Sequence, residues 1–424
     1  MKKKLFSYCM LCLWSLLNVS AQETFKVMFY NLLNYPLETA VPNREQDLEF
    51  ILSDYQPDLF LVCELNNIAG ANDVLNITRT AINPNFEMAT FVYNTSDDNI
   101  GDQNNLQNLL YYDSTKFIIE EEIIVQTYLR DFNVYKVKLN TVNQALNPIE
   151  VYVIVCHLKA SSGTTNEQRR FEMVEDLEDY LDTLPTDANV LLGGDLNLYT
   201  ASEAAFQNLL SDNNAITFVD LADRIGSWHN NTNYIDMFTQ STRTQNGMGG
   251  STGGFDDRFD FILATENMLS TAGLRYVADS YQVYGNNGLV SCYNRSINTS
   301  DCETTGSQYN FAIRDALHNF SDHLPVTVSL ETDATLLDID EVETASYLAL
   351  KQNVIDYNIA IYINSPQLIN EDLVIYNNIG QPVKTLKLNA NDQQQFDVSE
   401  LQNGLYILAG SSYNIKPLKF IISH

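Results

Sequence analysis

Several apolar stretches of this chain end at a side chain that can bind a cation or carry a proton. The stretches D-L-F-L-V-C, V-Y-V-I-V-C and V-L-L-G-G are followed by Glu64, His157 and Asp195, respectively. Asn197 stands two positions after Asp195, so these two side chains point to the same side of an extended chain. The paired glycines before Asp195 let the backbone turn sharply and let another group approach closely. The third stretch therefore indicates a strand that delivers two polar groups to one site.

The same pattern recurs on either side of these stretches. Asn31 follows V-M-F-Y, Asp260 stands inside R-F-D-F-I-L, and Asp322 with His323 precedes L-P-V-T-V-S-L. Each motif alone has a structural explanation, because G-D-x-N suits a tight turn with a helix-capping acid and Asp260 suits an ion pair with Arg258. Recurrence along the chain favours a shared site over unrelated turns.

These residue types suit the hydrolysis of a phosphoester. In-line displacement at phosphorus needs neutralised non-bridging oxygens, an oriented water and a proton donor for the leaving oxygen. Carboxylate and amide oxygens are the ligands that Mg²⁺ prefers, usually with only one or two carboxylates. Histidines transfer protons near neutral pH, and His157 and His323 are two of the five in the chain. The set predicts a metal-dependent hydrolase.

The elements that must position these residues are strands and helices in alternation. The three stretches are near-continuous β-rich apolar runs, which is typical of strands covered on both faces. Apolar residues at helical spacing predict helices over residues 44–55 and 166–184. A chain of 424 residues with 45% hydrophobic content can bury one large core and a smaller second one. We therefore expect an α/β region followed by a smaller unit.

Residues 1–21 have the pattern of a removable export signal. Three lysines are followed by a mostly apolar stretch, residues 5–19, and then by V-S-A, which would leave Gln22 first after cleavage. A membrane anchor is the alternative, but the stretch holds Ser7, Ser15 and Asn18 and is short for a span of about 20 residues. No other stretch is long and apolar enough to cross a bilayer. We expect export through the periplasm and a mature chain without a transmembrane segment.

The chain is strongly acidic. Its formal net charge is −30, and loss of three lysines with the signal makes it −30 − 3 = −33. This charge argues against a broad polyanion-binding surface. It does not exclude catalysis on phosphates, because divalent cations screen clustered carboxylates and bind the phosphate themselves. An acidic protein that acts on phosphate therefore implies a metal.

Four cysteines remain after the predicted signal. Cys292 and Cys302 bracket a polar stretch of an exported chain, which favours a disulfide that closes a local loop over two exposed thiols. Cys63 and Cys156 lie in the apolar stretches, and we interpret them as small buried hydrophobic residues.

Six motifs, taken in order, resemble those of the endonuclease/exonuclease/phosphatase superfamily, which contains deoxyribonuclease I, exonuclease III-like repair enzymes and neutral sphingomyelinases. The motifs are F-Y-N-L-L-N, P-D-L-F-L-V-C-E-L, C-H-L-K-A, G-G-D-L-N, D-R-F-D-F-I-L and S-D-H-L-P-V, and the resemblance covers residues 25–330. It implies an α/β fold, a four-layer αββα sandwich of two mixed sheets. It also implies a metal-dependent phosphodiesterase or phosphatase.

The resemblance assigns one group of residues to the metal and the attacking water. Glu64 would be the principal Mg²⁺ ligand, supported by Asn31 and Asp322, with Mn²⁺ or Ca²⁺ as alternative ions. Asp195 would orient or deprotonate the water. Leu33 stands where some repair-type members carry an acid, so we expect fewer direct protein ligands here.

The other motif residues are assigned to the phosphate. Asn197 would hold a phosphate oxygen. His323, steadied by Asp260, and His157 would stabilise the charge that develops on the phosphorane-like transition state and help the leaving oxygen depart.

Three further residues are candidate substrate contacts. Tyr112, or Tyr111 beside it, lies where family members often present a substrate-facing tyrosine. Arg130 and Arg170, the latter with Arg169 as its alternative, are candidate phosphate contacts, although solvated faces also explain arginines there. We interpret the Gly-rich residues 246–256 as a flexible loop beside the site. Residues 269–320 are interpreted as an insertion near its mouth, where substrate choice would be set.

The chain after the motifs has a different composition. Residues 334–345 are acidic and without a basic residue, as in a solvated linker, and short alternating strands over residues 346–424 predict a small antiparallel β-sandwich. This part resembles the C-terminal sorting domain of the type IX secretion system of Bacteroidetes, through I-Y-N-N-I-G-Q-P-V, V-S-E-L-Q-N-G-L-Y-I-L and L-K-F-I-I. Q-N-V-I-D replaces the usual Asn-Pro of that domain. The resemblance implies that machinery as a partner and an extracellular or cell-surface location; a carbohydrate- or surface-binding module is the alternative.

The sequence thus predicts a signal at 1–21, a catalytic domain at 22–333, a linker at 334–345 and a sorting domain at 346–424. The predicted function is a secreted, Mg²⁺-dependent phosphodiesterase with DNA or RNA as the leading substrate. A phospholipid head group or a small phosphoester, as for a sphingomyelinase-like enzyme, is the alternative substrate. A catalytically silent binding protein on the same fold is the third hypothesis.

Overall fold

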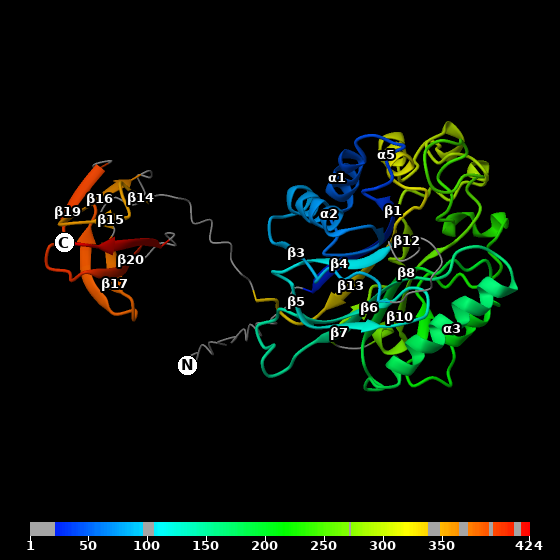
Figure 1. Ribbon diagram of the computed structural model, residues 1–424, viewed down its shortest axis with the longest axis horizontal. Coiled ribbons are helices and arrows are strands. Elements are labelled where there is room, and N and C mark those ends of the chain that lie inside the picture. Colours follow the sequence, from blue (N-terminus) through cyan, green and yellow to red (C-terminus); the bar gives the residue numbers. More distant parts are fainter. Residues whose placement is uncertain are drawn as a thin grey trace, which may run out of the picture. The chain divides into compact units, whose positions relative to one another are not determined.

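The computed structural model describes residues 22–95, 106–270, 273–337, 348–363, 372–389, 393–410 and 417–424. The predicted export signal and residues 338–345 of the predicted linker lie outside these ranges. The chain divides into two compact units, Met1–Leu337 and Asp338–His424, and each is described by itself (Figure 1). Within the described ranges, no helix combines the length and the apolar character needed to cross a membrane.

The first unit contains two mixed sheets. In the seven-stranded sheet the order is β11-β13-β1-β2-β4-β3, with β12 also paired to β13, and only the β1–β2 pair is parallel. The strands of this sheet are β1 (Glu23–Tyr35), β2 (Leu59–Leu65), β3 (Phe86–Met88), β4 (Gln107–Asp113), β11 (Arg275–Tyr276), β12 (Gln282–Val283) and β13 (Val326–Thr332).

In the six-stranded sheet the order is β5-β6-β7-β8-β10-β9, and only the β7–β8 pair is parallel. Its strands are β5 (Phe117–Val125), β6 (Phe132–Leu139), β7 (Glu150–His157), β8 (Val190–Asp195), β9 (Phe218–Asp220) and β10 (Asp260–Thr265).

Helices cover the outer face of each sheet. Figure 1 shows α1 (Arg44–Tyr55), α2 (Ile68–Ala81) and α5 (Phe311–Phe320) together on one side of the unit, and α3 (Thr164–Leu181) on the opposite side. The short α4 (Ala204–Leu209) packs with α3. Short 3-10 helices in the described part of this unit are η2 (Thr232–Met237), η3 (Glu266–Leu269), η4 (Val290–Cys292) and η5 (Ser300–Cys302). The layers are helix, sheet, sheet and helix, which confirms the predicted sandwich.

Two apolar clusters hold these layers together. One cluster joins the facing sides of the two sheets and continues under α1, α2 and α5, and the other lies between the six-stranded sheet and the helices α3 and α4. The sheets approach closely, because a Cβ added to Gly193 would lie 2.7 Å from Leu61 Cδ2 on the facing sheet. A Cβ on Gly194 would lie 2.3 Å from Cys156 Sγ of the adjacent strand. The paired glycines of the sequence therefore serve close packing on both faces of β8.

The segment between β10 and β13 is built around a disulfide. Cys292 and Cys302 are bonded, as the sequence predicted, whereas Cys63 and Cys156 are free and buried. The segment ends in α5, which begins after Asn310, whose side chain caps the helix by accepting from Ile313 N.

The start of the predicted linker belongs to the first unit. Val142 N donates to Thr335 O at 3.0 Å and Leu337 N donates to Asn140 O at 2.7 Å. The first unit therefore extends at least to Leu337, and residues 334–337 of the predicted linker pair with it.

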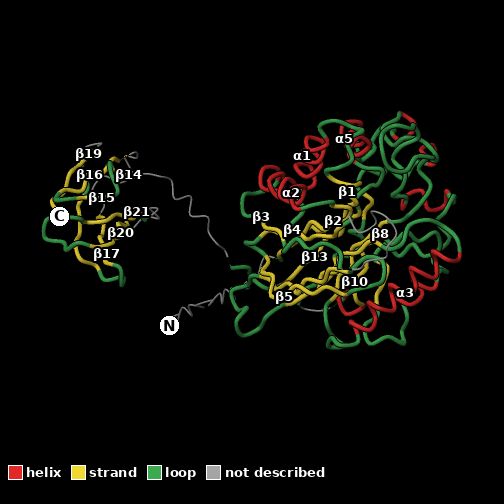
Figure 2. The backbone as a smooth tube through the Cα atoms, viewed as in Figure 1, coloured by secondary structure: helices red, strands yellow, loops and turns green. Residues whose placement is uncertain are grey.

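In its described ranges, the second unit contains strands and connecting loops but no helix (Figure 2). One sheet has the order β14-β16-β19 and the other β15-β21-β20-β17-β18, with β15–β21 as the parallel pair among otherwise antiparallel pairs. The two sheets share an apolar core of their own. The strands are β14 (Leu348–Leu350), β15 (Val354–Ile355), β16 (Asn358–Ile363), β17 (Asp372–Asn377), β18 (Pro382–Lys387), β19 (Gln393–Asp397), β20 (Gly404–Gly410) and β21 (Leu418–Ile422).

Candidate active site

The polar residues at the strand ends meet between the two sheets. On the six-stranded sheet, His157, Asp195 and Asp260 stand side by side, because His157 pairs with Asp195 across β7–β8 and Asp260 pairs with Asp195 across β10–β8. On the seven-stranded sheet, Asn31 pairs with the residue that precedes Glu64. The two parallel pairs thus contribute Asn31, Glu64, His157 and Asp195, and the amino end of the antiparallel β10 adds Asp260 beside them.

Asn31 joins two carboxylates from opposite sheets. Its Nδ2 donates to Glu64 Oε1 and to Asp195 Oδ2, both at 3.0 Å. Its Oδ1 accepts from Leu33 N at 2.9 Å, which fixes the orientation of the amide. Asn31 therefore offers its NH₂ group to the site, whereas the predicted role as a metal ligand requires the oxygen.

Glu64 is held on both carboxylate oxygens. Besides the bond from Asn31, its Oε2 accepts from Asn34 N at 3.0 Å. The backbone of Glu64 has a φ of 61°, in the left-handed region that residues with side chains seldom adopt. Such a conformation persists only where the surrounding structure holds it, and here it lies at a cluster of polar groups.

His323 faces the cluster from the segment that precedes β13. Its Nδ1 lies 2.7 Å from Asp260 Oδ2, and its Nε2 lies 3.7 Å from Asp195 Oδ2. Asp260 is fully buried, and its other oxygen, Oδ1, has no hydrogen-bond partner among the described residues. The predicted pairing of His323 with Asp260 is therefore present in the geometry.

His157 completes the cluster on the other side of Asp195. Its Nε2 lies 3.6 Å from Asp195 Oδ2 and its Nδ1 lies 4.0 Å from Glu64 Oε1. The Nδ1 atom is buried and makes no hydrogen bond with the part of the chain that the structure describes. A buried ring nitrogen without a partner is available to a bound group.

Burial and charge move the pKa values of these groups apart. Burial, followed by the charge of Asp322, raises the pKa of Glu64, and burial raises the pKa of Asp195 to about 7, against the lowering effect of His323. Burial and then the nearby Arg130 hold the pKa of His157 well below its usual range. Burial alone would lower the pKa of His323, but Asp260 and Asp195 raise it well above its usual range. These opposite shifts favour a neutral His157 and a protonated His323.

The donor set fits a divalent cation. Two groups of three side chains, Glu64 with His157 and Asp195, and Asp195 with Asp260 and His323, offer ligand atoms within 4.8 Å of one another. The half-buried carboxylate of Glu64 and the buried carboxylate of Asp195 resist ionisation, and a bound cation would favour their charged forms. The cluster is therefore a candidate metal site.

Two predicted site residues lie at the margin of the cluster. Asp322 is buried but is absent from both groups of candidate ligands, and its Oδ2 accepts from Ser251 N at 2.5 Å. Asn197 Nδ2 donates to Leu158 O at 3.3 Å, and its backbone N donates to Asp195 Oδ1 at 3.1 Å. Asn197 therefore ties the segment after β7 to the segment after β8.

The predicted arginine contacts turn toward the backbone. Arg130 Nη1 donates to Leu158 O at 2.9 Å, directly after His157. Arg170 Nη1 donates to Lys159 O and Ser161 O at 2.8 and 2.9 Å. Both arginines are buried, so they hold the segment that follows His157 and are not turned to solvent.

Tyr112 lies away from the cluster. It pairs with Leu59 at the start of β2, five residues before Glu64, which corresponds to about 16 Å along a strand. Its hydroxyl donates to Glu87 Oε2 at 3.1 Å. The adjacent Tyr111 is fully buried and donates to Ala71 O at 2.9 Å. The structure brings neither tyrosine to the site.

Sequence reasoning missed two residues beside the pair of His323 and Asp260, one next to each. Gln240 pairs by backbone with both His323 and Asp257, and its Nε2 lies 3.5 Å from His323 Nε2. Thr239 Oγ1 accepts from Phe259 N and from Asp260 N at 3.0 and 3.2 Å. Neither stands at the end of an apolar stretch or carries a titratable group, so the sequence holds no signal that would single them out.

A comparison with known families identifies most of the second unit. Residues 355–423 match the family model described as the secretion system C-terminal sorting domain, so the chain carries a type IX sorting domain and is directed to the cell surface or the exterior. No curated protein matches the chain.

Solved structures with a similar fold cover 73% of this chain. The human Nocturnin catalytic domain with bound sulfate is 14% identical, with 97% of that chain covered and a TM-score of 0.44. D. rerio TDP2 complexed with a single strand DNA product is 15% identical, with 99% covered and a TM-score of 0.46. An endonuclease/exonuclease/phosphatase family protein from Bacteroides thetaiotaomicron is 14% identical, with 96% covered and a TM-score of 0.44.

Proposed function

We propose that the first unit is a metal-dependent phosphodiesterase that hydrolyses nucleic acid. The observation that carries the proposal is the in-register row of His157, Asp195 and Asp260 on one sheet, faced by Glu64 on the other. This row supplies the acid, base and ligand atoms that in-line displacement at phosphorus needs. If these four residues served only to form unrelated turns, their side chains would not be expected to lie together between the two sheets.

The roles follow from the contacts. Glu64 would hold the cation together with the nearby Asp195, and the cation would neutralise phosphate oxygens and the leaving oxygen. Asp195, with its raised pKa of about 7, is suited to accept a proton from a water. His323 carries a proton on Nε2 when charged, and Asp260 fixes the ring through Nδ1. It is therefore suited to protonate the leaving oxygen or to stabilise its charge.

His157 is suited to a different task because it is neutral. Its Nδ1 is buried without a partner, so a phosphate oxygen is the kind of group that would complete its hydrogen bonds. Asn197 would then act mainly by fixing Asp195 through its backbone N. The difference in pKa between His157 and His323 allows one ring to bind and the other to transfer a proton.

A smaller phosphoester, such as a phospholipid head group, is the second candidate substrate. The net charge of −30 opposes a long polyanion, and the two buried arginines beside the cluster donate to backbone carbonyls. A short substrate would need fewer basic side chains, since the cation itself neutralises one phosphate.

The test is hydrolysis by the full chain with Mg²⁺ and with EDTA, on plasmid DNA, RNA, sphingomyelin and inositol phosphates. We expect metal-dependent nicking, and a loss of about 10²–10⁴ in rate for Asp195→Asn, with a comparable loss for Glu64→Gln. Glu49→Gln on the exposed face of α1 is the matched control and should keep the wild-type rate. Thermal unfolding of each variant separates lost chemistry from lost folding.

The outcomes distinguish the candidates. Hydrolysis of a lipid or small phosphoester without nicking would move the substrate to the second class and leave the site intact. Nicking that survives both Glu64→Gln and Asp195→Asn would reject the site. Absence of metal-dependent hydrolysis on every substrate would leave a binding protein on this fold.

A further inference from the structure

Asp322 is held by a segment that the chemistry described above does not use. We name residues 246–256 the strap. Ser251 N on the strap donates to Asp322 Oδ2 at 2.5 Å. Gly250 has a φ of 67°, and a Cβ at this position would lie 2.6 Å from Asp322 Cγ and 2.9 Å from Leu33 Cδ1. The strap can therefore approach the carboxylate only because residue 250 is glycine.

The strap is anchored at its base by Arg243, which is fully buried. Arg243 Nη1 donates to Met248 O and Gly249 O, both at 3.0 Å. Its Nε and Nη2 donate to His318 O and Asn319 O at the end of α5, both at 2.9 Å. One guanidinium thus ties the strap to the helix that leads into Asp322.

A disulfide-closed loop, residues 289–303, packs against the strap and its base. Ile297 N donates to Thr242 O at 3.2 Å, and Thr242 N in turn donates to Asp322 O at 3.2 Å. Farther along, Asn294 N donates to Phe255 O at 3.2 Å. A Cβ on Gly254 would lie 2.5 Å from Asn294 Oδ1, so this contact is also close. Two chains of contacts therefore run from the disulfide loop to Asp322.

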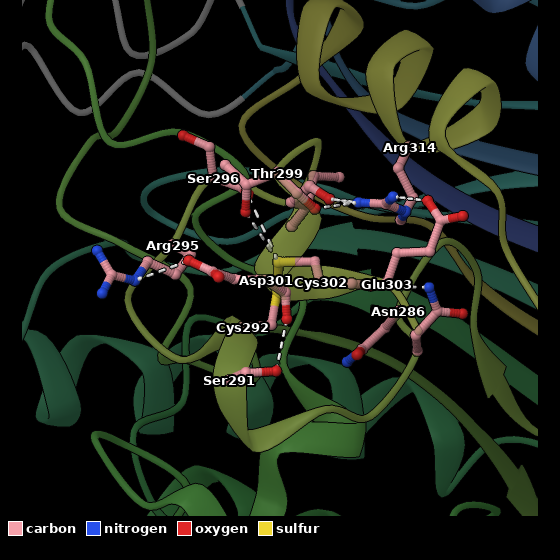
Figure 3. Close-up of a disulfide and its surroundings, with 12 residues drawn as sticks. Asn286, Ser291, Cys292, Arg295, Ser296, Thr299, Asp301, Cys302, Glu303 and Arg314 are labelled. Atoms are coloured by element: carbon pink, nitrogen blue, oxygen red, sulfur yellow. Dashed lines mark hydrogen bonds and ion pairs between the residues drawn. A yellow bond between two sulfur atoms is a disulfide. The ribbon is translucent and has the colours of Figure 1, made fainter. Parts of the chain in front are cut away.

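The disulfide loop is itself fixed from the side of α5. Figure 3 shows Arg314, which comes from α5, directed at Thr299 and Glu303 beside the disulfide. Arg314 Nη1 donates to Thr299 O at 2.9 Å, and the side chain is 1% exposed. The disulfide between Cys292 and Cys302 closes the loop at the same place.

We propose that the strap and the disulfide loop act together as a positioning unit for Asp322. The unit fixes the direction of the Asp322 carboxylate through the N–H of Ser251 and fixes its backbone through Thr242. Partners that orient a carboxylate near a metal change metal affinity without touching the ion. The inference rests on the proposed metal-dependent function. Asp322 lies between Ser321, whose Oγ donates to Asn31 O at 2.8 Å, and His323, which faces Asp260, so its backbone adjoins the candidate metal site.

The test is a pair of alanine substitutions at two glycines of the strap. Gly250→Ala places a methyl group against Asp322, whereas Gly247→Ala adds the same group at a φ of 89° with no atom within 4 Å. Both substitutions carry the backbone strain of a positive φ, so the two variants differ in the contacts with Asp322 and Leu33. We expect Gly250→Ala to weaken Mn²⁺ or Mg²⁺ binding by the full chain about 10–100-fold, measured by calorimetric titration, and Gly247→Ala to stay within about twofold of wild type.

A second variant tests the disulfide loop without touching the strap. In Cys292→Ser/Cys302→Ser the loop loses its covalent closure, and we expect weaker metal binding in the same direction as in Gly250→Ala. Thermal unfolding of the full chain identifies any variant that has lost its fold. If Gly250→Ala does not fold, the metal affinity of the double cysteine variant tests the proposal in its place. Rates of hydrolysis, measured alongside, should fall with metal affinity and recover at saturating metal.

The outcomes of this test separate the inference from the proposed function. Equal metal affinity in the two glycine variants, or wild-type affinity in the cysteine variant, would reject the positioning unit. The proposed metal-dependent function would not be affected by that result. A wild-type chain that binds no divalent cation and hydrolyses no phosphoester would reject the proposed function itself.

Discussion

The buried pair of Asp260 and His323 illustrates what single residues contribute to this site. A carboxylate with no exposure is tolerated in a protein interior when it is paired and hydrogen-bonded. Asp260 Oδ2 has such a partner in His323 Nδ1 at 2.7 Å, whereas Oδ1 has none within the described ranges. The pair therefore fixes a ring in place while leaving an uncompensated oxygen, a combination that suits a reactive site better than a structural ion pair.

Glu178 on α3 provides a test of burial at a single residue away from the site. Both of its carboxylate oxygens are buried, and burial, followed by the charge of Asp182, raises its pKa from 4.5 to about 8. Between these pH values the folded chain binds more protons than the unfolded chain, so the free energy of unfolding falls as the pH rises from 4.5 to 8. We expect Glu178→Gln to raise that free energy by about 1–2 kcal/mol at pH 8, after allowance for partial exposure, and to have no effect at pH 4.5.

Urea unfolding followed by tryptophan fluorescence measures this effect, since Trp228 is buried in the same apolar cluster as α3. Glu175→Gln, on the exposed face of the same helix, is the control and should be neutral at both pH values. A Glu178→Gln effect that is equal at pH 4.5 and pH 8 would contradict the assignment.

Residue types were easier to predict than their orientations. The order of motifs in the sequence pointed to Glu64, His157, Asp195, Asp260 and His323, and the strand register places all five around one space. The amide of Asn31 could not be predicted, because its orientation depends on a backbone N–H from Leu33. Gln240 could not be predicted either, because its place beside His323 arises from a bridge between segments far apart in the chain.

At the scale of elements, the loops after β7 and β8 are joined by one buried ion pair. Arg170 Nε donates to Glu203 Oε2 at 2.8 Å, and Glu203 Oε1 accepts from Tyr199 N at 2.9 Å. Arg170 also holds the carbonyls of Lys159 and Ser161. The loop that follows His157 and the loop that follows Asp195 therefore depend on the same guanidinium.

We expect Arg170→Ala to destabilise the protein by about 3–5 kcal/mol, because it leaves the Glu203 carboxylate buried without its partner. The rate of hydrolysis should fall as well, since the two loops follow His157 and Asp195, which we propose as catalytic groups. The neighbouring Arg169, which is partly exposed, offers a matched control, and Arg169→Ala should change neither quantity by much. Denaturant unfolding measures the stability and initial rates measure the hydrolysis. Equal stability and equal rates of Arg170→Ala and Arg169→Ala would contradict the proposal that Arg170 joins the two loops.

Elements with a continuous apolar pattern were the ones that the sequence could place. The predicted helix over residues 44–55 coincides with α1, and the predicted helix over 166–184 corresponds to α3 (Thr164–Leu181). The position of Tyr112 could not be predicted from its motif, because the register of β4 against β2 decides which end of the strand it occupies. The path of the strap depends on contacts with Asp322 and Asn294, which lie far from it in sequence.

At the scale of the molecule, each of the two units has its own apolar core. The clusters of the first unit contain no residue of the second, and the strands of the second unit pair only with one another within the described ranges. The sorting domain matched at residues 355–423 lies entirely in the second unit. Hydrolysis and export are therefore expected to depend on different units of one chain.

A chain that ends after Leu337 should keep the hydrolytic rate of the full chain within about twofold and should lose secretion, because the sorting domain is removed while the core of the first unit is intact.

A chain that ends after Asp333 is a sharper variant, since it also loses the bonds of Thr335 and Leu337 to residues 140–142. We expect it to be less stable than the first truncation by about 1–3 kcal/mol, the contribution of two hydrogen bonds. Denaturant unfolding of both truncations, hydrolysis rates and the fraction found outside the cells measure these effects. Equal stability of the two truncations would place the boundary at residue 333, and loss of activity after Leu337 would show that the first unit needs the second.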